Sequence, residues 1–300
     1  YGYRRFNSEI IRIFALGKVT KKAMIKRLLF YILLLLTSFG VSAVRVDTVT
    51  VATKHLATPM KLIVYTPDAA SAGGCFPTVY MLHGFAGDYT NWSLKEPRLA
   101  GLADSYGMIL VFPDGRDSWY WDSPVDKSMQ MESAITCDVV PYIDRHFPTV
   151  ADREHRAITG LSMGGHGSLW LASRHPDIWG NAGSMSGGVN ILPFPKSWRM
   201  SERLGAYETN KEVWKKHSVI NNIDAIKAAK LNIIFDCGAD DFFAGVNEDL
   251  HKRLLEAKIP HDYTSRPGNH SWDYWRNSAL YHLLFFNEAF RKADAQDVRK

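Results

Sequence analysis

The feature that most constrains the fold is a serine between two glycines, where a predicted strand meets a predicted helix. Residues 156–159 are typical of a strand, Gly160-Leu161-Ser162-Met163-Gly164 has the Gly-x-Ser-x-Gly spacing, and residues 165–173 can form a helix. A reactive serine has to stand on a tight, strained turn, and glycines two residues away on either side leave room for one. Ser162 is therefore the candidate nucleophile. The spacing alone is common by chance, so an idle serine in a glycine-rich turn is the alternative.

The first 43 residues differ from the rest in charge and hydropathy. They hold eight of the 36 lysines and arginines but one of the 31 acidic residues, so residues 44–300 carry 28 basic and 30 acidic side chains. The net charge of +5 therefore belongs to this leader, and we expect no nucleic-acid partner.

The leader has the layout of an export signal. Lys26 and Arg27 precede an apolar run over residues 28–37, and Val41-Ser42-Ala43 offers small residues at a cleavage site. We predict a signal peptide over about residues 24–43, hence a secreted or periplasmic protein with no stable membrane insertion after cleavage. A retained membrane anchor is the alternative, because the apolar stretch is near the lower length limit for a span.

Residues 44–300 are predicted to form a single α/β domain. The segment is long enough for one sizeable core and contains no repeat or low-complexity linker. Apolar runs alternate with helical patterns, which predicts a mostly parallel central sheet with helices on both faces. Strands are predicted over 46–51, 60–65, 78–82, 108–112, 156–159, 180–185, 231–236 and 262–265, and helices over 98–105, 130–146, 165–173, 248–257 and 272–290. Residues 189–230 are expected to form an insertion over the active site.

Two loops are candidates for binding substrate. His83-Gly84-Phe85-Ala86-Gly87 follows a predicted central strand, where backbone N–H groups can point at a ligand. We assign the N–H groups of Phe85 and Met163 to an oxyanion hole and consider His83 a substrate contact; a plain glycine turn is the alternative. In the second loop, Trp119-Tyr120-Trp121, we expect at least one ring to lie exposed and to stack on a sugar or aryl group; packing of the loop is the alternative.

A base and an acid are expected after the nucleophile in the chain, each at the carboxyl end of a strand. Of the later histidines, His270 is the one in the loop directly after the last predicted strand, whereas His251 and His282 fall inside predicted helices and His261 precedes that strand. The acid is sought in the loop after the strand at 231–236, where we favour Asp241 over Asp240. Its task would be to fix the imidazole tautomer and stabilise the imidazolium. Cys75, Cys137 and Cys237 match no metal-site spacing, and we expect no disulfide.

Four motifs together resemble the esterase D family of α/β-hydrolases, which includes feruloyl and acetylxylan esterases, S-formylglutathione hydrolases and the antigen 85 mycolyltransferases. They are residues 83–87, 160–165, 236–241 and 268–272, in that order along the chain. The resemblance implies the α/β-hydrolase fold, Ser162 as nucleophile, His270 as base, Asp241 as acid, and oxyanion donors at Phe85 and Met163.

The function expected from these observations is two-step acyl transfer without a metal or cofactor. An exported protein suits the carbohydrate-esterase branch of the family, with a feruloyl or acetyl ester of a small molecule or oligosaccharide as substrate. Acyl transfer to an alcohol, as in the antigen 85 branch, and a non-catalytic binding protein on the same fold remain open.

Overall fold

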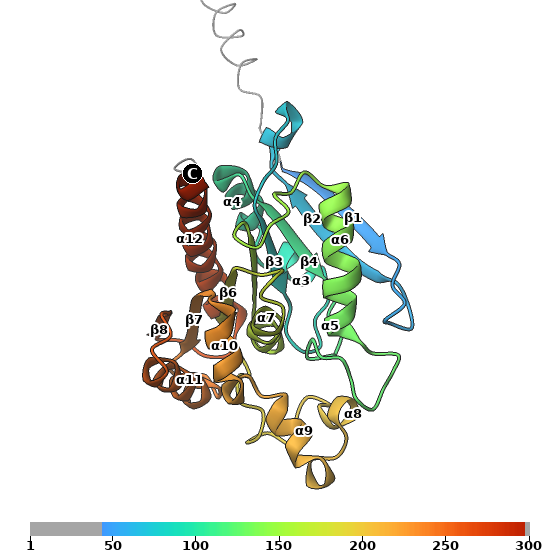
Figure 1. The fold of residues 1–300 in the computed structure, drawn as a ribbon, viewed down its shortest axis with the longest axis vertical. Coiled ribbons are helices and arrows are strands. Elements are labelled where there is room, and N and C mark those ends of the chain that lie inside the picture. Colours follow the sequence, from blue (N-terminus) through green and yellow to red (C-terminus); the bar gives the residue numbers. More distant parts are fainter. Residues whose placement is uncertain (1–43, 298–300) are drawn as a thin grey trace, which may run out of the picture. The chain divides into compact units, whose positions relative to one another are not determined.

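The computed structural model describes residues 44–297, which contain an eight-stranded sheet in the order β1-β2-β4-β3-β5-β6-β7-β8 (Figure 1). The two N-terminal strands are antiparallel to their neighbours, and β3 to β8 run parallel. This confirms the predicted mostly parallel sheet. The strands are β1 (Arg45–Val51), β2 (Met60–Thr66), β3 (Thr78–Leu82), β4 (Ile109–Pro113), β5 (Arg156–Gly160), β6 (Asn181–Met185), β7 (Asn232–Gly238) and β8 (Asp262–Arg266).

Helices cover both faces of the sheet, because its central strands are apolar on both sides. In β3, Tyr80 and Leu82 pack into one buried cluster, and Val79 and Met81 pack into the other. The first cluster includes α5, α6, α7, α10 and α11, and the second includes α4 and α12. The helices are α3 (Asn91–Lys95), α4 (Arg98–Tyr106), α5 (Met131–Ser133), α6 (Val140–His146), α7 (Met163–Arg174), α8 (Ser201–Leu204), α9 (Lys211–Lys216), α10 (Ile223–Ala229), α11 (Ala244–Glu256) and α12 (Trp272–Asp297).

The helix predicted over residues 130–146 is interrupted. A π-helical segment, Ala134–Val139, separates α5 from α6. Shorter 3-10 turns occur at Asp68–Ala72, Tyr207–Thr209 and Val219–Asn221.

The predicted insertion over residues 189–230 divides into two parts. Trp198, in the first part, packs beside Phe242 and Phe243, whose rings contact His270. In the second part, α10 packs on α7 instead. The expectation of an insertion near the active site therefore holds for the first part of the segment.

The predicted leader, residues 1–43, lies outside the described residues, so the predicted signal peptide or anchor stays a prediction. Within residues 44–297, no helix is both long and apolar enough to cross a membrane. The three cysteines are free; Cys75 and Cys137 are exposed and Cys237 is buried.

Candidate active site

Ser162 stands on a sharp turn between β5 and α7. Its backbone has φ +56° and ψ −116°, a conformation that non-glycine residues rarely adopt. The flanking glycines are required by close packing: a Cβ on Gly160 would lie 2.6 Å from the Gly164 backbone, and one on Gly164 would lie 2.5 Å from the Leu82 carbonyl oxygen. The strained serine turn expected from the spacing is present.

The structure brings Ser162, His270 and Asp241 together, although 108 and 29 residues separate the two pairs along the chain. His270 Nε2 lies 2.9 Å from Ser162 Oγ, and His270 Nδ1 lies 2.9 Å from Asp241 Oδ2. Ser162 follows β5, Asp241 follows β7 and His270 follows β8, so each comes from the carboxyl end of a parallel strand. Asp240, the other candidate acid, is exposed.

Asp241 fixes the orientation of the imidazole. Its side chain is completely buried, and Oδ1 accepts the backbone N–H of Phe243 at 2.8 Å. An ionised carboxylate only accepts hydrogen bonds, so the neutral His270 ring carries its hydrogen on Nδ1. The lone pair on Nε2 then faces the Ser162 hydroxyl, as proton removal from that hydroxyl requires.

The turn His83–Gly87 lies against the nucleophile. A Cβ on Gly84 would come within 3.3 Å of Ser162 Cβ and 2.6 Å of Leu161 Cδ1, so any larger residue there would force the Leu161 side chain to move and would press on the nucleophile. Phe85 is half-buried, and Met163 begins α7, where the first N–H groups have no partner inside the helix. Within residues 44–297, neither the Phe85 nor the Met163 N–H donates to another protein group. Both are available to a developing oxyanion.

His83 does not face the site as a substrate contact. Its side chain is 1% exposed, Nδ1 donates to the Gly84 carbonyl at 2.7 Å, and Nε2 accepts the Gly115 N–H at 2.8 Å. The ring uses both nitrogens to join the turn after β3 to the turn after β4. The expectation that His83 binds substrate is therefore wrong, because no polar atom of its ring is left for a ligand.

The expectation of an exposed ring in Trp119-Tyr120-Trp121 is also wrong, since all three side chains are at most 1% exposed. Trp119 and Tyr120 have positive φ, 56° and 61°, which turns the chain back on itself and sends all three rings inward. Their polar atoms bond internally, Trp119 Nε1 to the Trp198 carbonyl, the Tyr120 hydroxyl to the His83 carbonyl and Trp121 Nε1 to His166. Trp119 and Trp121 have no surface to offer a substrate.

Comparison with known proteins decides the family. The family model named Esterase matches residues 53–285. The chain belongs to this esterase family. An acetyl esterase of Caldicellulosiruptor saccharolyticus is 27% identical over 212 residues, covering 66% of this chain and 78% of the relative. An S-formylglutathione hydrolase of Mus musculus is 25% identical over 239 residues, covering 71% and 83%. A solved ferulic acid esterase superposes with a TM-score of 0.73 at 26% identity, over 83% of this chain and 99% of that one.

The esterase is accordingly a carboxylic ester hydrolase, and its resemblance to the esterase D family of α/β-hydrolases is confirmed. The predicted α/β-hydrolase fold is confirmed as well.

An aromatic surface beside His270 was missed by the sequence analysis. The Phe242 side chain is 53% exposed, and its ring centroid lies 4.2 Å from that of His270. Trp198 stacks on Phe242 at 5.7 Å. The signal was available, because Phe242 directly follows the candidate acid in the sequence, and an apolar residue there has to lie near the imidazole.

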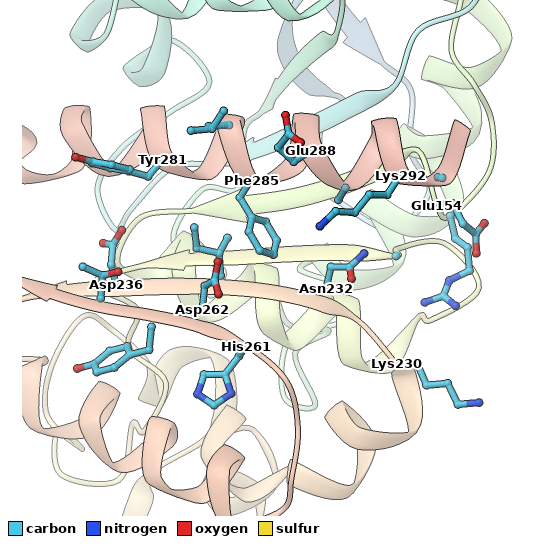
Figure 2. A pocket seen from close by; sticks show the side chains of 18 of the residues that line it. Glu154, Lys230, Asn232, Asp236, His261, Asp262, Tyr281, Phe285, Glu288 and Lys292 are labelled. Carbon is cyan, nitrogen blue, oxygen red and sulfur yellow. The ribbon is translucent and has the colours of Figure 1, made fainter. Parts of the chain in front are cut away.

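The esterase also has a groove of about 1080 Å³ between α12 and the strands β7 and β8. Figure 2 shows Tyr281, Phe285, Glu288 and Lys292 on the helix side, with Asn232 and Asp262 on the strands. Ser162, His270 and Asp241 do not line this groove. It is therefore separate from the candidate active site, although it is large.

Proposed function

We propose that the protein is an exported serine esterase in which Ser162 attacks the ester, His270 is the general base and Asp241 orients the imidazole. The observation that carries this proposal is the 2.9 Å contact between Ser162 Oγ and His270 Nε2, with Asp241 at the other ring nitrogen. A serine hydroxyl is a weak nucleophile until a base takes its proton, and the contact with His270 Nε2 supports His270 as that base. The proposed reaction uses no metal or organic cofactor.

In the first step, His270 Nε2 takes the hydroxyl proton as Ser162 Oγ bonds to the ester carbonyl carbon. The carbonyl oxygen becomes an oxyanion, which the N–H groups of Phe85 and Met163 stabilise by about 3 to 4 kcal/mol per donor. The intermediate then collapses, and His270 returns the proton to the departing alcohol. In the second step, His270 activates a water that releases the acid from the acyl-serine.

We propose acyl esters of carbohydrate as substrates, with a feruloyl or acetyl group on a small molecule or oligosaccharide. Support comes from the acetyl esterase and ferulic acid esterase relatives. The exposed Phe242 ring beside His270 adds to this, because an aromatic face suits an aryl group or the apolar face of a sugar. The departing alcohol takes its proton from His270, so the alcohol leaves on the side of the site where the Phe242 ring lies.

The first experiment compares hydrolysis of p-nitrophenyl acetate by the full chain and by Ser162→Ala. Release of nitrophenolate by the parent but not by the variant supports the proposal, and feruloylated and acetylated oligosaccharides are then compared as substrates. A folded parent as slow as the variant contradicts it and favours a non-catalytic binding protein. Transfer of most acyl groups to an added sugar, rather than to water, contradicts hydrolysis as the main reaction.

Export is tested separately, by N-terminal sequencing of the protein produced in a bacterium. A mature protein that begins at Val44 and is found outside the cytoplasm supports cleavage of a signal peptide. Membrane-bound protein that retains residues 24–43 supports the anchor instead.

A further inference from the structure

His166 lies four residues after Ser162, in the first turn of α7, and its side chain is completely buried. It touches neither His270 nor Asp241. Three indole rings surround it: Trp121 at 5.1 Å and Trp119 at 5.5 Å meet it edge to face, and Trp170 stacks at 6.2 Å between centroids. A polar ring in such surroundings needs a partner for each nitrogen, since an unpaired buried polar atom is costly.

Both nitrogens of His166 have a partner, and the partners fix its tautomer. Trp121 Nε1 donates to His166 Nε2 at 2.8 Å, and His166 Nδ1 lies 3.0 Å from the Gly188 carbonyl oxygen. An indole N–H only donates and a carbonyl only accepts, so Nε2 is unprotonated and Nδ1 carries the hydrogen. Burial lowers the pKa of His166 to about 3, so the ring stays neutral at the pH of an esterase assay.

Gly188 connects His166 to the nucleophile. The Gly188 N–H donates to the Ser162 carbonyl at 3.3 Å, and the Ser162 N–H donates to the Met185 carbonyl at 2.9 Å. The Ser162 carbonyl also accepts the backbone N–H of His166 at 3.0 Å, a bond that any side chain at position 166 keeps. The short segment 185–188 therefore bonds to the Ser162 N–H and supplies the second of the two bonds to its carbonyl. The backbone of this segment is itself strained, because the non-glycine residue Ser186 has φ +47°. Gly188 also packs against Trp119, whose ring atoms lie 2.8 to 2.9 Å from the position of an added Cβ.

We propose that His166 is a positioning residue for the nucleophile. Its Nδ1–H holds the Gly188 carbonyl, and Gly188 in turn holds the Ser162 backbone in its strained conformation. The inference rests on the proposed function, because it takes Ser162 as the attacking group. His166 touches no reacting atom, so its loss lowers kcat and leaves KM nearly unchanged: misplacing a nucleophile by about 1 Å costs on the order of 10²-fold in rate.

The test uses two variants that each keep one of the two hydrogen bonds. The amide nitrogen of asparagine is attached to Cγ, as is Nδ1 of histidine, so His166→Asn keeps the donor to Gly188 and loses the acceptor for Trp121. His166→Gln places its amide one atom further out, so it keeps the acceptor for Trp121 and loses the donor to Gly188. Each variant loses one buried hydrogen bond, and we expect similar drops in melting temperature.

We expect kcat for p-nitrophenyl acetate to be about 10-fold or more lower in His166→Gln than in His166→Asn, with KM values within about twofold of each other. The rate at which diisopropyl fluorophosphate modifies Ser162 should show the same order, because it reports the reactivity of the serine without an ester substrate. Equal kcat values in the two variants overturn the inference, as does a loss that appears only in KM or follows melting temperature. His166 would then be a packing residue.

Trp121→Phe is a second route to the same answer if either His166 variant fails to fold. It removes the indole N–H and keeps a buried aromatic ring, while the Gly188 carbonyl still accepts only from Nδ1–H, so the tautomer and the hold on Gly188 are kept. We expect a lower melting temperature with kcat within about threefold of the wild type; a loss of kcat as large as that of His166→Gln at constant KM overturns the inference.

His175→Asn and His175→Gln are the matched controls. His175 follows the same helix and pairs with Glu132 at 2.8 Å, away from Ser162. Both controls should keep the wild-type kcat, and a drop in both like that of His166→Gln overturns the specific role of His166. The wild type and Ser162→Ala are measured in parallel. If these two are equally slow, the proposed function fails as well; if they differ and the two His166 variants do not, this inference fails alone.

Discussion

The same parts of the fold carry two rows of side chains, each made of a hydroxyl, an imidazole and a carboxylate. We call Ser162, His270 and Asp241 the outer chain, and Thr159, His282 and Asp236 the inner chain. In one, Ser162 follows β5, Asp241 follows β7 and His270 precedes α12. In the other, Thr159 lies within β5, Asp236 within β7 and His282 within α12. Thr159 Oγ1 is 2.7 Å from His282 Nδ1, and His282 Nε2 is 3.4 Å from Asp236 Oδ2.

The two chains differ in access and in the partners of the carboxylate. The His270 side chain is 17% exposed, whereas Thr159 and His282 are 0% exposed. Asp236 also accepts hydrogen bonds from Arg266 at 3.2 Å and Ser278 at 2.8 Å. A sealed hydroxyl cannot meet an ester, so the inner chain ties strands and helix together. Residue types alone therefore do not distinguish the proposed triad from the inner chain; the exposure of the His270 side chain does.

Removing the hydroxyl from each chain should give the largest contrast. We expect Ser162→Ala to lower kcat for p-nitrophenyl acetate by about 10⁴-fold or more, because it removes the proposed attacking atom. Thr159→Val keeps the shape of the side chain and should change kcat less than about threefold. It leaves the buried Nδ1 of His282 unpaired, which should lower the stability of the fold by about 1 to 3 kcal/mol. Steady-state kinetics and urea unfolding measure the two effects, and a large loss of kcat in folded Thr159→Val would contradict the distinction.

The carboxylates should separate in the same way. Asp241→Asn presents an amide to His270 and favours the wrong tautomer, so kcat should fall by about 10⁴-fold with little loss of stability. Asp236→Asn leaves the Arg266 guanidinium without its counter-charge and should lower stability by about 3 kcal/mol. Both are checked by kinetics and urea unfolding. The proposed difference between the two carboxylates is contradicted if Asp241→Asn unfolds the protein while the activity per folded molecule is unchanged.

A glycine lies against each chain and allows a finer test. A Cβ at position 84 would press on Leu161 and Ser162, so Gly84→Ala should lower kcat by about 10- to 100-fold. A Cβ at position 183 would lie 2.5 Å from His282 Nδ1 and 2.7 Å from Thr159 Oγ1. Gly183→Ala should therefore cost about 1 to 3 kcal/mol of stability. A lower kcat at constant stability in Gly183→Ala would show that the inner chain takes part in catalysis.

A third carboxylate near histidine, Glu132, extends the comparison to pH. Burial alone would raise its pKa, but hydrogen bonds from His175, Arg174 and Trp170 outweigh burial and hold the pKa below its ordinary value. A depressed carboxyl pKa stabilises the fold above the unfolded-state pKa, and this contribution is lost as the pH falls through the folded-state pKa. Glu132→Gln should therefore flatten the loss of stability below about pH 4.5, as urea unfolding at several pH values would measure. An unchanged pH profile would contradict this.

The sequence predicted the sheet and the members of the proposed triad because local patterns carry that information. Apolar runs bounded by glycine or proline mark buried strands, and Gly160 and Gly164 are dictated by close approach of backbone atoms at their own positions. Ser162, Asp241 and His270 were expected to meet because each follows a parallel strand, and parallel strands end at the same edge of the sheet.

Other features depend on contacts that the local pattern does not contain. The inward turn of Trp119 and Tyr120 rests on positive φ values in non-glycine residues, which no residue type there indicates. The π-helical segment between α5 and α6 keeps apolar residues at nearly helical spacing, so one continuous helix was expected. His166 meets Trp121 across 45 residues of sequence, and neither residue alone signals the hydrogen bond.

Strand β8 ends the sheet, and its outer backbone edge has no neighbouring strand within the described residues. An open edge of this kind is a template on which a second molecule can add a strand, the usual first step of aggregation. β8 is five residues long and carries Asp262 and Arg266 at its two ends. A short strand limits such pairing because few hydrogen bonds can form along it, but in an antiparallel pair of two copies Asp262 of one would face Arg266 of the other, so the end charges do not oppose it. The length of β8, rather than the charges at its ends, is therefore what opposes edge-to-edge association of two copies of this enzyme.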